Sequence, residues 1–325
     1  MILTRRFGRA LASVFLAPVL GAASAPPAPL PAPSPVVRAV PLATRPDVAA
    51  LFGMDVAQFR QRGAASLGRT ASERFGGPVT IAPADVDVWA VPDRTAGSTG
   101  AGVIAVPAGA IVHADGSVSP PRRLGRHRPS SPFEPTFSSN WGDEFFFSWV
   151  HYGHRRGSPM CGTTLGEVRA QFEYARLPNV VAGSPWDYWG LAERSVAEVT
   201  RPSSNCQDAI HWFTQQAQSL SPGAYAARQE PLTGRTGKCE TTTLTVGGTF
   251  NGLTASLQQH IERCEAWSIV GGLAPTARSW YGVEYANHGV WNQLQREAGA
   301  VEILRVPRGS DIGLNTKLGI LLGLR

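Results

Sequence analysis

The segment that determines the predicted fold class is Thr164-Leu-Gly-Glu-Val-Arg-Ala-Gln-Phe-Glu-Tyr-Ala175. Thr164 and Glu167 have the spacing of a capping box, in which a Thr and a Glu three residues later bond to each other's backbone at the start of a helix. Val168, Phe172 and Ala175 would then lie on one face of that helix. The segment is therefore predicted to be helical.

Further helix signals follow towards the C-terminus. Ser184 can cap a helix with Pro185 at its first position, and other caps start at Asn205 and Thr254. The predicted helices cover 164–175, 184–199, 205–220, 254–264 and 288–297. Strands are predicted at 241–246, 279–285, 301–306 and 314–324. Helices and strands mix without regular βαβ alternation, so the predicted class is α+β: a disulfide-stapled mixed domain after a small N-terminal region with short β-runs.

The region 46–128 is predicted to be a small separate part of the chain. Asp55 can cap a helix over 56–62, and Thr70 with Glu73 forms a second capping box. Short β-runs follow at 79–81, 85–91, 103–106 and 111–113, the last ending at the turn signal Asp115-Gly116. The stretch 120–135 contains five prolines and four arginines, which is typical of a protease-sensitive linker. Residues 129–325 then form the Cys- and Trp-rich main domain.

The first 25 residues have the layout of a secretory signal peptide. A basic start (Arg5, Arg6, Arg9) precedes an apolar run over 10–20 and the small residues Ala23-Ser-Ala25. The proline-rich stretch 26–45 is predicted to be an extended spacer. We therefore expect a secreted or cell-envelope protein, and no stretch reaches the roughly 20 apolar residues that would span a membrane.

The cysteines are the second sign of export. They are Cys161, Cys206, Cys239 and Cys264. An even number in an exported protein predicts disulfides. We favour Cys161–Cys206 and Cys239–Cys264, because loops of tens of residues close readily. The alternative is a zinc site made by Cys206, His211, His260 and Cys264.

Charge excludes one class of partner. The formal net charge of +6 falls to about +3 without residues 1–25, which hold three arginines and no acid. This is too weak for a nucleic-acid-binding surface. No cofactor or metal ion is expected.

The stretch 140–154 is the first candidate for catalysis. It contains the carboxylates Asp143 and Glu144, the imidazoles His151 and His154, and six aromatic side chains. Carboxylates with imidazoles can act as general acids and bases. Read as a strand, 145–151 places alternate aromatic residues and His151 on one face and His154 on the other; read as a helix, Gly153 ends it.

Aromatic residues gather in two further stretches. The candidate binding residues are Trp186, Tyr188, Trp189, Trp280, Tyr281, Tyr285, His288 and Trp291. Exposed aromatic rings bind sugars, because a sugar ring has an apolar face and polar edges, although such residues also fill cores. Two functions follow: a binding module for a cell-wall or extracellular glycan, which we favour, or a secreted hydrolase made as a zymogen with its acid–base residues in 143–154.

Overall fold

The computed structural model describes residues 36–93, 100–121, 126–127, 135–156, 163–178, 183–202, 208–231, 242–250, 252–261, 267–270, 280–286 and 294–324. All of them belong to one compact unit, Ser34–Arg325. The helices are α1 (Pro46–Leu51) and α2 (Val56–Phe75), with short 3-10 turns at Leu42–Thr44 and Pro83–Asp85. The strands are β1 (Val40–Pro41), β2 (Val86–Pro92), β3 (Ala101–Pro107), β4 (Ile111–Val112), β5 (Val118–Ser119), β6 (Arg126–His127), β7 (Thr136–Phe137), β8 (Glu144–Arg156), β9 (Thr163–Arg176), β10 (Trp186–Arg201), β11 (Asp208–Ser219), β12 (Tyr225–Glu230), β13 (Thr242–Phe250), β14 (Leu253–Ile261), β15 (Trp267–Val270), β16 (Tyr281–Ala286), β17 (Gln295–Pro307) and β18 (Leu314–Leu324).

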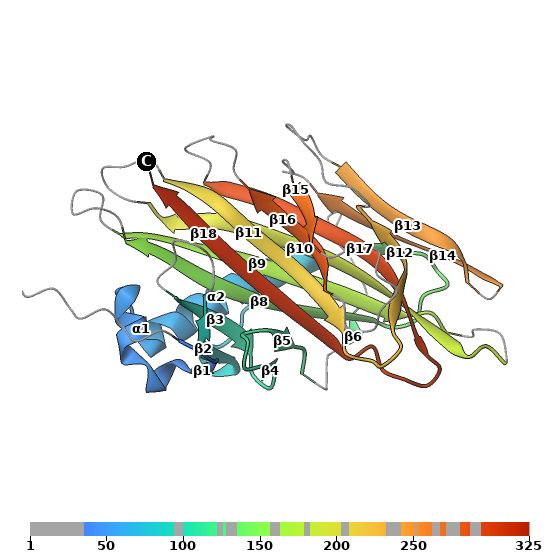
Figure 1. Cartoon of the computed structure of the whole chain (residues 1–325), viewed down its shortest axis with the longest axis horizontal. Coiled ribbons are helices and arrows are strands. Elements are labelled where there is room, and N and C mark those ends of the chain that lie inside the picture. The colour runs from blue at the N-terminus through green and yellow to red at the C-terminus, as the bar shows by residue number, and fades with distance from the viewer. Residues whose placement is uncertain are drawn as a thin grey trace, which may run out of the picture. The chain divides into compact units, whose positions relative to one another are not determined.

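The strands form three antiparallel sheets (Figure 1). Sheet A has the order β1-β2-β3-β8-β9-β10-β17-β12, with β6 also paired to β8. Sheet B has the order β15-β16-β11-β18-β5-β4, and sheet C consists of β13, β14 and β7. Through β3 and β8, the strands before residue 121 join the same sheet as those after residue 135.

The predicted α+β class is wrong. Strands make up 59% and helices 15% of the described residues, with α1 and α2 as the α-helices. Where the structure describes them, the segments predicted as helices over 164–175, 184–199, 205–220 and 254–264 form β9, β10, β11 and β14, and the end of 288–297 lies in β17. The predicted disulfide framework is not seen: no disulfide lies among the described residues, and all four cysteines lie outside them.

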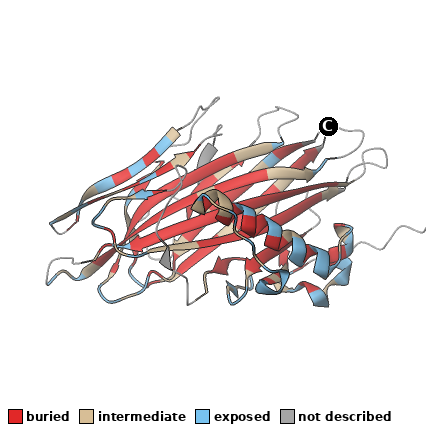
Figure 2. Ribbon diagram, turned by 180° about the vertical axis from the view of Figure 1, so that it is seen from behind, coloured by how far each residue is buried: buried red, intermediate tan, exposed pale blue. Residues whose placement is uncertain are grey.

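Sheet A is covered on both faces, which explains why its strands are buried almost throughout. Sheet B packs on one face, where Trp149 Nε1 of β8 donates to Thr316 Oγ1 of β18 at 2.8 Å. On the opposite face α2 lies across the strands (Figure 2). Ser66 of α2 donates to Glu167 of β9 at 3.0 Å. Sheet C packs beside α2 on this second face, where Ile261 approaches Gly299 of β17. We call the side towards sheet B the inner face and the other the helix face.

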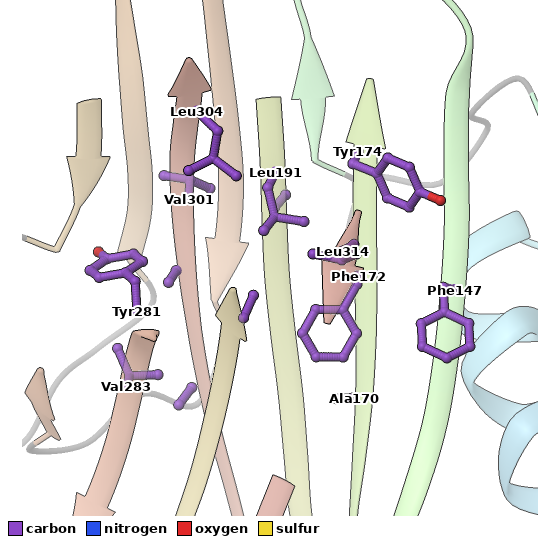
Figure 3. Close-up of a cluster of buried hydrophobic side chains, with 14 of the residues drawn as sticks. Phe147, Ala170, Phe172, Tyr174, Leu191, Tyr281, Val283, Val301, Leu304 and Leu314 are labelled. Atoms are coloured by element: carbon purple, nitrogen blue, oxygen red, sulfur yellow. The ribbon is translucent and has the colours of Figure 1, made fainter. Parts of the chain in front are cut away.

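Segment 164–175 forms a strand because its side chains alternate in polarity. Val168, Ala170, Phe172 and Tyr174 lie on the inner face, in an apolar cluster with Leu191 and Leu304 of the neighbouring strands (Figure 3). Glu167, Arg169, Gln171 and Glu173 lie on the helix face and are buried beneath α2. The spacings of Thr164 to Glu167 and of Val168 to Phe172 match those of a helix only by coincidence.

Other elements agree better with what the sequence predicts. Asp55 caps α2 as predicted and also forms a capping box with Gln58, but the helix runs on to Phe75 and ends at Gly76, whose φ of 64° suits glycine. The Thr70 capping signal therefore lies inside a helix instead of starting one. Over the described residues, the strands predicted at 85–91, 103–106, 111–113, 241–246, 279–285, 301–306 and 314–324 are confirmed, whereas 79–81 is not a strand. No helix in the described part of the chain is long and apolar enough to cross a membrane.

Candidate functional site

A pocket of about 340 Å³ opens at the end of the two sheets where the chain passes from β17 to β18. Its lining residues are Pro121, Phe145, Tyr174, Arg176, Trp189, Gly309, Ser310 and Asp311. Pockets that bind small molecules are of this size class, about 300–1,000 Å³, and combine aromatic walls with a few polar groups. We call it the aromatic pocket.

Three neighbouring strands supply the aromatic walls. Phe145 of β8 lies directly opposite Tyr174 of β9, and their rings stack with centroids 5.3 Å apart. Trp189 of β10 adds a third ring, tilted by 46° and 6.1 Å from Tyr174. Because each residue is on the inner face near its strand end, the rings gather at the mouth of the space between sheets A and B.

Polar groups surround these rings. Arg176 donates to Asp187 at 2.7 Å, and the same carboxylate accepts from the Gly309 backbone at 2.8 Å, so the turn after β17 is tied to β10. Asp311 is exposed on that turn. Trp189 is only 8% exposed, and its indole Nε1 has no hydrogen-bond partner. A buried donor without an acceptor costs free energy and requires an explanation, such as a bound ligand.

The electrostatics of the aromatic pocket suit an uncharged ligand. It has one guanidinium, from Arg176, and one carboxylate, from Asp311. Burial raises the pKa of Tyr174 above its ordinary range, and the Asp311 carboxylate acts in the same direction. The Tyr174 hydroxyl therefore stays neutral and can donate a hydrogen bond at any physiological pH.

A larger pocket of about 700 Å³ lies beside α2, but the groups in it already bind each other. Buried Glu167 accepts from Ser66 and from Arg69, at 3.0 and 2.8 Å, and Arg69 also contacts Glu198 at 2.9 Å. Burial, and then the charge of Glu198, raise the pKa of Glu167, while the nearby arginines oppose the shift. This network attaches α2 to sheet A.

More ion pairs continue this network under α2. Arg74 contacts Glu173 at 2.5 Å, Arg169 contacts Glu73 at 3.3 Å, and Arg194 is paired with Glu297. Each of the buried carboxylates here faces a guanidinium. We therefore interpret the helix face as a structural interface.

The four predicted acid–base residues do not gather in one place. β8 is a strand, so His151 lies on the inner face and His154 on the helix face, where its ring contacts Phe52 at 4.5 Å. Burial lowers the pKa of both imidazoles, that of His154 to about 4. Asp143 is exposed before the strand, and Glu144 at its start is 3.6 Å from Arg74.

The predicted aromatic binding residues are also divided. Of those on β10, Trp189 lines the aromatic pocket, whereas Tyr188 packs on Phe250 of sheet C and the Trp186 ring contacts Arg305 at 4.1 Å. Tyr281 and Tyr285 are buried between sheets A and B, and Trp280 is half-buried. His288 and Trp291 lie outside the described residues, as do the cysteines of the alternative zinc site; its histidines, His211 and His260, are on sheets B and C.

Trp189 is the one lining residue of the aromatic pocket that was identified from the sequence as a binding residue; Tyr174, Arg176 and Asp311 are among those that were not. A signal existed for Tyr174, because the alternation of polarity from Glu167 onwards places it on the apolar face of a strand. Nothing in the sequence brings Asp311 to the same site.

The chain matches no known protein family and no curated protein. Its function must therefore be inferred from its own residues.

Proposed function

We propose that the chain is an exported saccharide-binding protein and that the aromatic pocket is its binding site. The observation that most supports this is the buried, unpartnered Nε1 of Trp189 in a pocket walled by three aromatic rings. A sugar ring offers C–H groups that pack on aromatic faces and hydroxyl groups that accept from the indole N–H.

The polar groups favour a sugar over two other ligand classes. A phosphate or nucleotide would need an excess of cations, but the lining has one arginine and one aspartate. A purely apolar ligand would leave Trp189 Nε1 unpaired. Hydroxyl groups can satisfy the indole, the Tyr174 hydroxyl and the Asp311 carboxylate together.

The N-terminal segment supports an extracellular setting for this binding. The basic, apolar and small-residue regions of 1–25 are typical of an export signal. We therefore propose a glycan of the cell wall or extracellular matrix as the partner. Fractionation of the native cells tests this, with the protein expected in the medium or envelope and not in the cytoplasm.

Calorimetric titration tests the binding site itself. The full chain is titrated with defined tetrasaccharides of β-1,4-linked N-acetylglucosamine, glucose and xylose, and of α-1,4-linked glucose. We expect at least one to bind, and Trp189→Phe to weaken it about tenfold, because the ring remains but the N–H is lost. Asp311→Ala, at an exposed position, should also weaken it.

Trp186→Phe is the matched control, since Trp186 lies on the same strand outside the pocket. It should bind as the wild type does. If no saccharide binds, or if Trp189→Phe and Asp311→Ala leave the affinity unchanged, the proposal is wrong.

A further inference from the structure

An arginine is held between two aromatic rings at the same end of sheet A as the aromatic pocket. Arg305 of β17 lies opposite Tyr188 of β10 and Tyr225 of β12, on the helix face of the sheet. Its guanidinium carbon is 4.1 Å from the centre of the Trp186 ring and 3.6 Å from that of Tyr225. The two rings are inclined at 71°, so the guanidinium lies in the corner between them. We call Arg305, Trp186 and Tyr225 the arginine corner.

The cation of the arginine corner has no anionic partner. Arg305 forms no ion pair or hydrogen bond with any described residue, and its Nε is buried. The side chain is partly exposed, and Nε is its one nitrogen that is both buried and unbonded, so the terminal nitrogens reach the surface. An apolar side chain would fill the corner without the cost of desolvating a cation. The arginine therefore indicates a ligand.

Other arginines that contact aromatic rings in the described part of the chain are different. Each of these three also has a polar partner: Arg62 has Glu167, Arg74 has Glu173, and Arg296 has the Tyr285 hydroxyl. In the arginine corner the rings stabilise the cation and cover its flat faces, which leaves the N–H groups at its edge for a partner.

Arg308 adds a second guanidinium beside the arginine corner. Its Nη1 donates to the Ser184 carbonyl at 3.1 Å, and its backbone N–H donates to the Pro185 carbonyl at 2.9 Å. Arg308 therefore lies against the residues that precede Trp186. It is exposed and forms no ion pair with a described residue. Two guanidiniums without a carboxylate partner favour an anionic ligand.

The turn after β17 borders both the arginine corner and the aromatic pocket. Arg308 directly precedes Gly309, which lines the pocket. The Gly309 backbone donates at 2.8 Å to Asp187, the neighbour of Trp186. Trp186 of the corner and Trp189 of the pocket lie on one strand, about 10 Å apart at the usual rise per residue. An oligosaccharide of a few units spans this distance.

We propose that the saccharide bound by this protein is acidic: the aromatic pocket takes an uncharged sugar unit, and the arginine corner takes the carboxylate of a neighbouring uronic acid unit. This inference rests on the proposed saccharide binding and names the class of glycan. A carboxylate is planar, so its two oxygens can accept from two N–H groups at the edge of one guanidinium. Such charged hydrogen bonds are stronger than neutral ones, so the carboxylate should add to the affinity of the pocket.

Calorimetric titration of the full chain with matched pairs of tetrasaccharides tests the inference. Each pair consists of an acidic form and its carboxyl-reduced form, in which every carboxylate is replaced by an uncharged hydroxymethyl group. One pair has alternating glucuronic acid and N-acetylglucosamine, and the other has α-1,4-linked galacturonic acid. We expect at least one acidic form to bind about tenfold more tightly than its reduced form, and this preference to decrease as salt is added.

Arginine variants then locate the preference. Arg305→Gln should remove most of it and Arg308→Gln should reduce it severalfold, while both leave the affinity for the reduced form unchanged. Arg60→Gln is the matched control, because it removes an exposed arginine of α2, and it should keep the full preference. Near-UV circular dichroism checks folding, and the exposed position of Arg308 makes its variant informative even if Arg305→Gln folds poorly.

Three results would overturn the inference. One is equal affinity for the acidic and reduced forms; if the reduced form still needs Trp189, saccharide binding stands and the arginine corner alone is excluded. Another is a preference for the acidic form that survives both glutamine variants. The third is equally tight binding of a reduced form that carries sulfate groups, since the carboxylate would then not be what is recognised. Failure of both forms to bind would refute saccharide binding as well.

Discussion

Replacing Glu302 with glutamine should change how the stability of the protein depends on pH. Burial raises the pKa of Glu302 from an ordinary value of 4.5 to about 8. The folded state therefore binds this proton more tightly than the unfolded state. Its contribution to stability is fully present below pH 4.5 and is lost as the pH rises to about 8.

The difference between these two pKa values sets the size of the effect. At about 1.4 kcal/mol for each pH unit, it corresponds to at most about 5 kcal/mol in the free energy of unfolding. Glutamine cannot ionise, so Glu302→Gln lacks this loss. Near pH 4.5 the variant should be about as stable as the wild type, and near pH 8 it should be more stable by several kcal/mol.

Urea denaturation at intervals between pH 4.5 and 8.5 measures this directly. Glu297→Gln is a useful comparison, because Glu297 is a buried glutamate on the same strand that is paired with Arg194. Its replacement should destabilise the protein by about 3 kcal/mol throughout, since it leaves a buried charge with a weaker partner. If the curves of wild type and Glu302→Gln run parallel across this range, Glu302 is ionised in the folded protein and the reasoning is wrong.

Three further predictions concern the fold. Arg74→Ala should destabilise by about 3–5 kcal/mol in urea denaturation, because it removes the guanidinium that faces the buried Glu173 carboxylate; a loss below 1 kcal/mol would mean that the pair is solvated. Gly282→Ala should destabilise strongly, since its Cβ would lie 2.0 Å from the Gln215 carbonyl oxygen, whereas Gly77→Ala, with open space around it, should change Tm little; equal effects would contradict this packing. Asp55→Ala should lose about 1 kcal/mol with the cap of α2, and an unchanged Tm would show that the cap is unimportant.

The sequence predicted the N-terminal elements and the later strands, but not the class of the fold. Elements such as α2 and β2 depend on local signals, namely a capping box and a short run of β-branched residues. The segment 164–175 carries two signals: a capping-box spacing, on which the helix prediction rests, and a strict alternation of polarity from Glu167 to Tyr174, which the structure follows. The polar half of that alternation is buried against α2, which hydropathy alone does not indicate.

The strand β10 was harder to predict for a physical reason. Both faces of β10 are covered, so apolar residues such as Leu191, Ala192 and Val196 occur on both faces. The alternation of polar and apolar residues that marks a half-exposed strand is therefore missing. Its glutamates therefore resemble the exposed residues of a helix.

The candidate sites depend on contacts between distant parts of the chain. Trp189 was identified from the sequence, but Tyr174 and Asp311 join it only because β9, β10 and the turn after β17 meet at one end of the sheets. The sequence offers a weaker signal for the burial of Glu302: in the predicted strand 301–306, this charged residue lies on the same face as the apolar Leu304.

The most direct test of saccharide binding is the indole N–H signal of Trp189 in the full chain labelled with ¹⁵N-tryptophan. The signal is assigned as the one missing from Trp189→Phe, and a tetrasaccharide selected by calorimetry is then added. The account predicts that this signal moves downfield as Nε1 gains an acceptor, while that of Trp186 stays in place. A Trp189 signal unchanged at saturating saccharide would contradict it.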